Sequence, residues 1–472
     1  MTMRVEQDSI GKLPIPQEAY YGVQTLRAKQ NFTISNEPLH PIFIKNMALI
    51  KKAAALTNYK DNQLTKPIAE AIVQASDEVA AGHFLDEFIV DAVQGGAGTS
   101  ANMNMNEVLA HRASELLGDT KDTYDTVHPN DHVNRSQSTN DVFPTAGKLT
   151  VLELMPQLIS SLSYLESLLG QKSEQFTDVI KMGRTQLQDA VPTTLGHSFK
   201  AYQSAIKREI RHLKTVIEDM YIVNIGATAI GNSINASDEY CANITKNLAH
   251  ETKLPLKQAE DLFDATQNVD GFVRVSGAIK TTAITLSKMS NDLRLMSSGP
   301  KTGFGEINLP AKQNGSSIMP GKVNPVILEV VSQVAYQIVG NDVTITMAAE
   351  GGQLELNPFE PIIFRNLFSS LDLLTNAVFT LADNCIIGIT ANREHCLEQV
   401  ENSVGIATAL CPYIGYQKAS DIAKEALKTG TSIRTLLLEK DWMNKEELAI
   451  VLNLKELAEG QSFIKKKTTV YM

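Results

Sequence analysis

Apolar residues recur at intervals of three and four along the middle of the chain, which is the spacing of amphipathic helices. The pattern is sustained over four long stretches, at 155–169, 195–220, 279–296 and 363–381. Shorter helical patterns lie at 42–60, 66–84 and 418–427, and Gly430 follows the last of them as a stop signal. The sequence therefore predicts a mainly α protein built around a bundle of long helices.

The stretch 326–349 differs from the others because apolar residues occupy nearly every face, and Glu329 and Asp342 are its only charged residues. Its β-branched content permits a strand, but its length favours a helix. A helix that is apolar all round must be buried on all sides. The other helices of one chain would cover it, yet a bundle completed by neighbouring subunits accounts for it more economically.

These patterns divide the 472 residues, which exceed one ordinary domain, into three predicted domains. Residues 1–138 form a mixed, mainly helical N-terminal domain. Residues 139–390 form the central long-helix bundle, and residues 391–472 form a small helical C-terminal domain.

Charge and composition narrow the classes of function. The net charge is −10, and the one polybasic run, at 465–467, is too short for the basic footprint of a nucleic-acid-binding protein. The four cysteines show neither CxxC nor metal-ligand spacing. The N-terminus lacks the apolar core of a signal peptide, and no stretch is long enough for a convincing membrane span. We therefore expect a cytoplasmic protein.

The segment 315–325, GSSIMPGKVNP, concentrates hydroxyls, a cation and an amide within a run rich in glycine and proline, 301–322. Such a run is typical of a binding loop or lid. Free backbone N–H groups and Lys322 suit an anion. A serine among these donors can be held as an alkoxide and act as a base. The plain alternative is a solvated Ser/Gly loop.

Three other polar segments precede this loop. The first, 94–104 (QGGAGTSANMN), presents Thr99 and Ser100 as donors at a glycine turn before a helix. Its glycine spacing imitates a dinucleotide-binding fingerprint, but no alternation of strands and helices follows. A tight turn with a purely structural role is the alternative.

The second segment, 128–141 (HPNDHVNRSQSTND), contains three consecutive uncharged hydrogen-bonding residues at 138–140, which suit carboxylate recognition. The spacing of His128 and His132 is weak evidence for a metal site. The third segment, 183–192 (GRTQLQDAVP), is a polar turn between two long helical patterns. A polar loop that caps a helix and an inert connection are the respective alternatives.

Together the four segments resemble the fumarase/aspartase superfamily of β-eliminating lyases, whose signature GSSxMPxKxNP is similar to 315–325. The resemblance covers essentially the whole chain. Four features are closer to the aspartate ammonia-lyase (aspartase) family than to class II fumarases: YYGVQTLRA at 20–28, the GGAGTSxNMN segment, Gln186 in place of histidine, and Glu360 in place of lysine. Pro358 departs from the usual valine, and His128 opens its segment as in fumarases.

This resemblance implies a three-domain fumarase/aspartase-like fold and a homotetramer whose active sites are each assembled from three subunits. It implies reversible elimination of ammonia from L-aspartate to give fumarate, with Ser316 as the base that removes a proton from C3 and an aci-carboxylate intermediate. Donors that bind the doubly charged carboxylate better than the ground state would supply most of the help.

The resemblance also assigns substrate contacts. Thr99, Ser138, Thr139 and Ser317 are expected to bind the β-carboxylate, Thr185, Gln186, Lys322 and Asn324 the α-carboxylate, and Asn140 the amino group. Neither an organic cofactor nor a metal ligand is expected, and a divalent cation such as Mg²⁺ stays open as an activator. The alternatives are a class II fumarase, which eliminates water from malate, and a catalytically silent helical scaffold.

Overall fold

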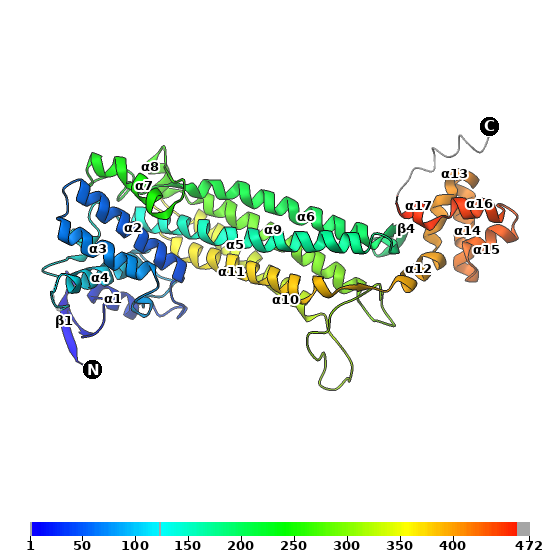
Figure 1. The fold of residues 1–472 in the computed structure, drawn as a ribbon, viewed down its shortest axis with the longest axis horizontal. Coiled ribbons are helices and arrows are strands. Elements are labelled where there is room, and N and C mark those ends of the chain that lie inside the picture. The colour runs from blue at the N-terminus through cyan, green and yellow to red at the C-terminus, as the bar shows by residue number, and fades with distance from the viewer. Residues whose placement is uncertain (1, 122–123, 460–472) are drawn as a thin grey trace. The chain divides into compact units, whose positions relative to one another are not determined.

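The computed structural model describes residues 2–121 and 124–459, and its fold is mainly α, as predicted (Figure 1). The longest helices are α5 (Thr139–Gln175), α6 (Leu195–Val216), α9 (Asp270–Met296), α10 (Val326–Glu350) and α11 (Glu360–Asn384). They contain the periodic stretches 155–169, 279–296 and 363–381 and the apolar stretch 326–349, which is a helix and not a strand. The stretch 195–220 runs from α6 into a 3₁₀ helix at Ile217–Tyr221. None of the helices among the described residues is long and apolar enough to cross a membrane.

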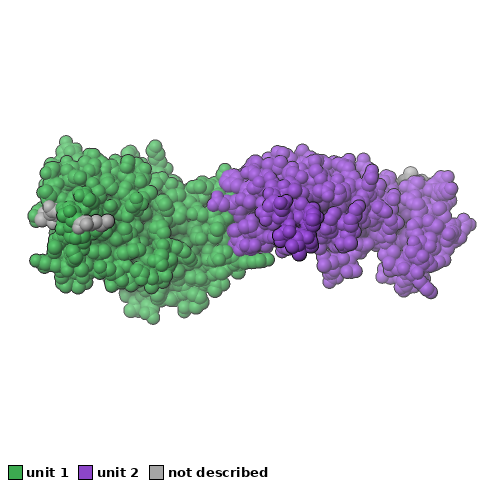
Figure 2. All heavy atoms as spheres, turned by 90° about the horizontal axis from the view of Figure 1, so that it is seen from below, with its two compact units in different colours: residues 1–160, 211–283, 336–375 green, residues 161–210, 284–335, 376–472 purple. Residues whose placement is uncertain are grey.

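The chain folds into two compact units (Figure 2). Unit 1 comprises residues 1–160, 211–283 and 336–375, and unit 2 comprises residues 161–210, 284–335 and 376–472. Each of the five long helices contributes residues to both units, so neither unit is a continuous piece of sequence. The division into three domains at residues 138 and 390 stays a prediction.

Besides parts of the long helices, unit 1 contains shorter elements from two regions of the sequence, 3–116 and 222–267. They are the antiparallel pair β1 (Met3–Gln7) and β2 (Lys12–Pro16), the helices α1 (Val23–Asn31), α2 (Pro41–Lys60), α3 (Lys66–Ala80), α4 (Thr99–Leu116), α7 (Asp238–Thr252) and α8 (Leu262–Gln267), and the parallel pair β5 (Ile222–Val223) and β6 (Lys257–Gln258). The helix expected at 66–84 ends at Ala80, because Gly82 takes a positive φ of 94°. Buried aromatic rings form part of the core, with Phe143 and Phe364 at 5.2 Å between ring centroids and Phe272 and Phe364 at 4.9 Å.

Unit 2 contains a β-hairpin where the sequence predicted a polar turn. Strands β3 (Ile180–Thr185) and β4 (Gln188–Thr194) pair antiparallel, with Ile180 opposite Thr194 and Thr185 opposite Gln188. The two residues between the strands, Gln186 and Leu187, both take positive φ, at 55° and 64°. Two such residues form the tight turn whose twist matches antiparallel strands. The expectation of a simple turn at 183–192 was therefore wrong.

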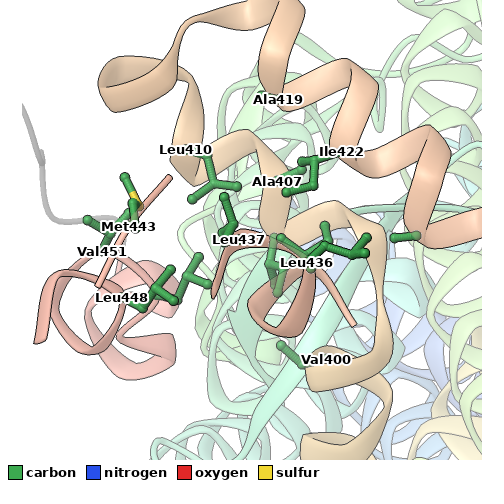
Figure 3. Close-up of a cluster of buried hydrophobic side chains, with 14 of the residues drawn as sticks. Val400, Ala407, Leu410, Ala419, Ile422, Leu436, Leu437, Met443, Leu448 and Val451 are labelled. Atoms are coloured by element: carbon green, nitrogen blue, oxygen red, sulfur yellow. The ribbon is translucent and has the colours of Figure 1, made fainter. Parts of the chain in front are cut away.

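The C-terminal part of unit 2 consists of short helices around one apolar cluster (Figure 3). The helices are α12 (Arg393–Asn402), α13 (Cys411–Ile414), α14 (Tyr416–Thr429), α15 (Ile433–Glu439), α16 (Lys445–Val451) and α17 (Leu454–Ala458). The strand β8 (Thr390–Ala391), just before α12, pairs antiparallel with β7 (Ile307–Asn308), which lies much earlier in the chain. Val400, Ile422, Leu437 and Leu448 contribute to the cluster from different helices. Gly430 ends α14 in the left-handed conformation, which confirms the predicted stop.

Helix α10 is not covered on all sides by its own chain. Tyr336, Val339, Val343 and Met347 share one face of the helix and are 65%, 37%, 58% and 61% exposed. On the opposite side, Ile338 and Ile345 are buried. The requirement that this apolar helix be buried all round is therefore unmet within the single chain.

Candidate functional site

The loop that carries Ser316 and Lys322 is anchored before it becomes exposed. Glu306 is fully buried and forms ion pairs with Lys181 Nζ at 3.0 Å and with Arg184 Nη1 at 2.5 Å. Its backbone carbonyl accepts a hydrogen bond from Asn392 N at 2.9 Å. Within the predicted lid over 301–322, residues 305–307 are buried and fix it around Glu306, whereas residues 308–322 are exposed or half-buried.

The exposed part of the loop closes on itself. Gly315 N donates to Lys322 O at 2.9 Å, and Asn324 Nδ2 donates to Gly315 O at 2.7 Å. A Cβ atom at Gly315 would lie 2.4 Å from Lys322 O and 2.9 Å from Asn324 N. Only glycine therefore permits this close approach of the two ends of the loop.

Ser316 sits at a turn that favours negative charge on its hydroxyl. Its Oγ accepts hydrogen bonds from Ile318 N at 3.2 Å and Met319 N at 3.0 Å. Backbone donors of this kind stabilise an oxyanion. Among the described residues, the side chains of Ser317 and Lys322 have no hydrogen-bond partner and are exposed, so they are available to an anion.

Thr185 and Gln186 lie exposed at the tip of the β3–β4 hairpin. The hairpin is held through Arg184, which pairs with Glu306 and whose guanidinium lies 4.2 Å from the centre of the Phe304 ring. Glu306 lies in the buried stem, residues 305–307, of the loop 301–322 that carries Ser316, which we call the serine loop. The same buried carboxylate therefore fixes both the hairpin and that stem. The sequence contained no sign of this connection.

In unit 1, Thr99 is the first residue of α4 and follows Gly98, which takes a φ of 88°. A Cβ atom at Gly98 would lie 2.4 Å from the Phe143 ring, so glycine is required there by both backbone conformation and space. Thr99 Oγ1 donates to Gly96 O at 2.7 Å. This is the glycine turn before a helix that the sequence predicted.

Ser138, Thr139 and Asn140 form the beginning of α5. Asn140 N donates to Ser138 Oγ at 3.2 Å, and Asn140 Nδ2 donates to Ala229 O at 2.7 Å. Thr139 Oγ1 accepts from Asn102 Nδ2, in the first turn of α4, at 3.1 Å. The N-terminal ends of α4 and α5 are thus joined. Helix N-termini present free N–H groups and favour anions, as carboxylate recognition requires.

Asp141, a buried residue in the first turn of α5, fixes this end of the helix. Its carboxylate accepts hydrogen bonds from the backbone N–H groups of Ser138, Gly226 and Thr228, each at 3.0 Å. Burial raises the pKa of Asp141 to about 6, although the three donors act in the opposite direction. Sequence reasoning missed this structural role, because an aspartate in a polar segment is usually solvated.

Two further expectations concern Glu360 and metal ions. Glu360 begins α11 and is 2% exposed, and burial raises its pKa well above the ordinary value against the field of Lys148. No hydrogen bond or ion pair of the described residues joins Glu360 to the predicted site residues. Within residues 2–121 and 124–459, no group of three or more His, Cys, Asp or Glu side chains is arranged to hold a metal ion.

The predicted site residues are thus divided between the units. Thr99, Ser138, Thr139 and Asn140 lie in unit 1, and Thr185, Gln186, Ser316, Ser317, Lys322 and Asn324 lie in unit 2. Within unit 1 the residues meet at two helix N-termini. Within unit 2 they lie on a loop and a hairpin that share an anchor. Their individual roles toward a substrate stay predictions.

Known proteins are similar to this chain over nearly its whole length. Residues 11–340 match the family model described as Lyase, and residues 406–459 match the one described as Fumarase C C-terminus. An aspartate ammonia-lyase from Bacillus sp is 50% identical over 96% of this chain and 97% of its own length. Another from Helicobacter pylori (strain ATCC 700392 / 26695) is 49% identical over 98% of this chain and 100% of its own length. The chain belongs to the fumarase/aspartase superfamily.

Solved structures of the superfamily share the fold. The fumarate lyase:delta crystallin from Brucella melitensis bound to cobalt has a TM-score of 0.94 at 48% identity, covering 97% of this chain and 100% of that chain. A recombinant class II fumarase from Schistosoma mansoni has a TM-score of 0.93 at 37% identity, covering 98% of this chain and 100% of that chain. The predicted fumarase/aspartase-like fold is therefore confirmed.

The close approach of the two ends of the serine loop at Gly315 can be tested by substitution. Gly315→Ala is expected to force Lys322 O and Asn324 N apart and to displace Ser316, which should lower turnover on the order of 10²-fold. Steady-state kinetics would measure the change, and far-ultraviolet circular dichroism would confirm that the helices are retained.

Gly321→Ala is the matched control in the same loop. Gly321 takes a φ of 80°, but its Cβ atom would meet nothing within 4 Å, so the variant carries only the backbone cost of about 1–2 kcal/mol. Equal turnover in the two variants would show that the contact at Gly315 is unimportant.

Proposed function

We infer that this chain is a carbon–nitrogen lyase that catalyses the reversible elimination of ammonia from L-aspartate to give fumarate. The observation that carries this function is identity of 47–50% to aspartate ammonia-lyases from several bacteria over at least 96% of this chain. The class II fumarase of similar fold is 37% identical. The serine loop and both helix N-termini provide the base and the anion-binding groups that such an elimination needs.

In the proposed reaction Ser316 removes a proton from C3 of L-aspartate. The N–H groups of Ile318 and Met319 already point to its Oγ, at 3.2 and 3.0 Å, and would stabilise the alkoxide before the reaction. Removal of the proton leaves a doubly charged aci-carboxylate, and collapse of this intermediate expels ammonia from C2. The helix N-termini at Thr99 and Ser138 would hold that β-carboxylate together with Thr139 and Ser317.

The α-carboxylate and the amino group complete the proposed contacts. Lys322 is an exposed cation of the loop, and Thr185 and Gln186 are exposed at the hairpin tip, so all three are accessible to the α-carboxylate. Asn140 is assigned to the amino group. Asn324 Nδ2 donates to Gly315 O in this conformation, so its amide supports the loop, and its contact with substrate stays a prediction. The chemistry uses proton transfer and anion binding, and the proposal includes no organic cofactor. Activation by a divalent cation such as Mg²⁺ stays open.

The decisive test of the function is the ultraviolet absorbance of fumarate after the protein is added to L-aspartate and, separately, to L-malate. We expect fumarate from aspartate alone. Fumarate from malate alone would make the protein a class II fumarase, and no fumarate from either substrate would favour the catalytically silent scaffold.

Removal of the base tests the mechanism. Ser316→Ala is expected to lower turnover by on the order of 10²–10⁴-fold, which is the usual contribution of a positioned base. Calorimetric binding of fumarate to the variant is the control, since it reports whether the loop still closes on an anion. Near-normal turnover would eliminate Ser316 as the base.

We also propose a homotetramer whose active sites are shared among three subunits. The uncovered apolar face of α10 supports this assembly, because burying Tyr336, Val343 and Met347 against another copy removes apolar surface from water. Light scattering is expected to give a mass of about four times 51.6 kDa, and Val343→Asp to lower it. A monomeric wild-type protein would contradict the proposal.

A further inference from the structure

Lys51, on α2, is a fully buried lysine without an ionic partner. Its exposure is 0%, and its Nζ donates hydrogen bonds to Asn134 Oδ1 at 2.9 Å and to Gln137 Oε1 at 3.0 Å. No ion pair to Lys51 occurs in the described part of the chain. Taking an ammonium group from water into the interior is costly, and two neutral amide oxygens compensate only part of the loss.

The hydrogen bonds of Lys51 connect it to the N-termini of both α4 and α5, where the substrate carboxylate is proposed to bind. Asn134 Oδ1, which accepts from Lys51, also accepts from Asn102 Nδ2 at 3.1 Å and from Asn106 Nδ2 at 3.2 Å. Asn102 is in the first turn of α4, and the same Nδ2 donates to Thr139 Oγ1 at 3.1 Å. Gln137 directly precedes Ser138. The ammonium therefore lies beneath the joined N-termini of α4 and α5.

The surroundings of Lys51 are polar but nearly without charge. Its Nζ contacts the neutral amides of Asn134 and Gln137, in the segment before α5. The amides of Asn102 and Asn106, on α4, bind the same Asn134 oxygen and are also neutral. The field of Asp141, on α5, favours the charged lysine. Burial nevertheless dominates and lowers the pKa of Lys51 to about 7.

A methionine of similar length would fill this position without the cost of a buried charge. A perturbed buried cation is more often kept where function uses it. The Lys51 ammonium also binds the amides that orient the beginnings of α4 and α5. Its charge and its hydrogen bonds therefore both affect the N-termini of these two helices.

We propose that Lys51 is a positioning residue for carboxylate binding, whose buried ammonium holds Asn134 and Gln137 beneath the N-termini of α4 and α5 and makes that half of the site electropositive. This inference rests on the proposed function, which places a substrate carboxylate at these helix ends. It assigns Lys51 no contact with the substrate.

The proposal has a consequence for protons. A dicarboxylate bound above Lys51 stabilises its charged form, so the pKa of Lys51 is higher in the complex than its value of about 7 in the free protein. Between these two values the complex binds more protons than the free protein. Binding therefore takes up a proton above pH 7, and affinity falls as pH rises through this window. Below pH 6 both states are protonated and uptake from this group disappears.

The first experiment uses the wild-type protein. Fumarate binding is measured by titration calorimetry at pH 6 and pH 8, in two buffers of different ionisation enthalpy, so that the difference in heat reports proton uptake. We expect uptake that approaches about one proton per site at pH 8 and is lost at pH 6. Binding without uptake at pH 8 would overturn the proposal for Lys51 and leave the proposed function intact. Failure to bind fumarate or to form it from aspartate would instead count against the proposed function.

Lys51→Met and Lys52→Met form a matched pair. Lys52 is the next residue of α2, but it pairs with Asp77 at 2.8 Å and Glu251 at 2.9 Å, away from the helix ends. Lys51→Met is expected to weaken fumarate binding at pH 6 about tenfold, or about 1.4 kcal/mol, to abolish proton uptake at pH 8, and to raise KM for aspartate more than it lowers kcat. Lys52→Met should retain wild-type affinity and uptake.

Proton uptake separates this role from a merely structural one, since loosened packing alone does not remove it. Wild-type uptake in Lys51→Met would overturn the proposal. If Lys51→Met fails to fold, the wild-type calorimetry still decides the matter.

Discussion

A carboxylate buried in a protein must be satisfied by donors or cations, and this constraint fixes the polar segments of both units. In unit 2, Glu306 receives Lys181 and Arg184 and thereby joins the β3–β4 hairpin to the stem of the serine loop. In unit 1, Asp141 receives three backbone N–H groups that set the beginning of α5. Glu107 does the same for α1, whose Gly22, Gln24 and Thr25 N–H groups all donate to it. Burying each carboxylate costs free energy. This cost is offset only when the cations or N–H groups named above are placed around it, so each carboxylate requires one local geometry.

The sequence predicted the long helices because their apolar period persists over many turns, beyond what chance spacing produces. It also predicted the glycine turn before α4 from the three glycines of 94–104, and the structure shows that Gly98 there takes a left-handed conformation beside Phe143. The β3–β4 hairpin was missed for a physical reason. Its turn residues, Gln186 and Leu187, take positive φ without the asparagine or glycine that usually marks such turns. Tertiary contacts must therefore offset the free-energy cost of this backbone conformation.

Lys51 and Lys52 illustrate the limit of sequence reasoning about sites. The two residues are chemically identical and adjacent, yet one is fully buried beneath the predicted site and the other pairs with Asp77 and Glu251. The difference follows from the direction that each side chain takes from α2, which depends on how this helix packs in the folded chain. Motif residues such as Ser316 are recognisable from their neighbours in sequence. Residues that act through those motifs from another helix are not.

A protein of net charge −10 that binds a dicarboxylate faces overall repulsion, and the arrangement of its site explains how this is overcome. Charges farther away than about 8–10 Å are largely screened at physiological ionic strength, so groups near the ligand decide binding. Helix N-termini and hydroxyls favour an anion while adding no exposed charge. Lys322 supplies one exposed cation from the loop, and Lys51 would supply one buried cation. A buried cation is screened little by salt, so its contribution should persist at ionic strengths that weaken the contribution of Lys322.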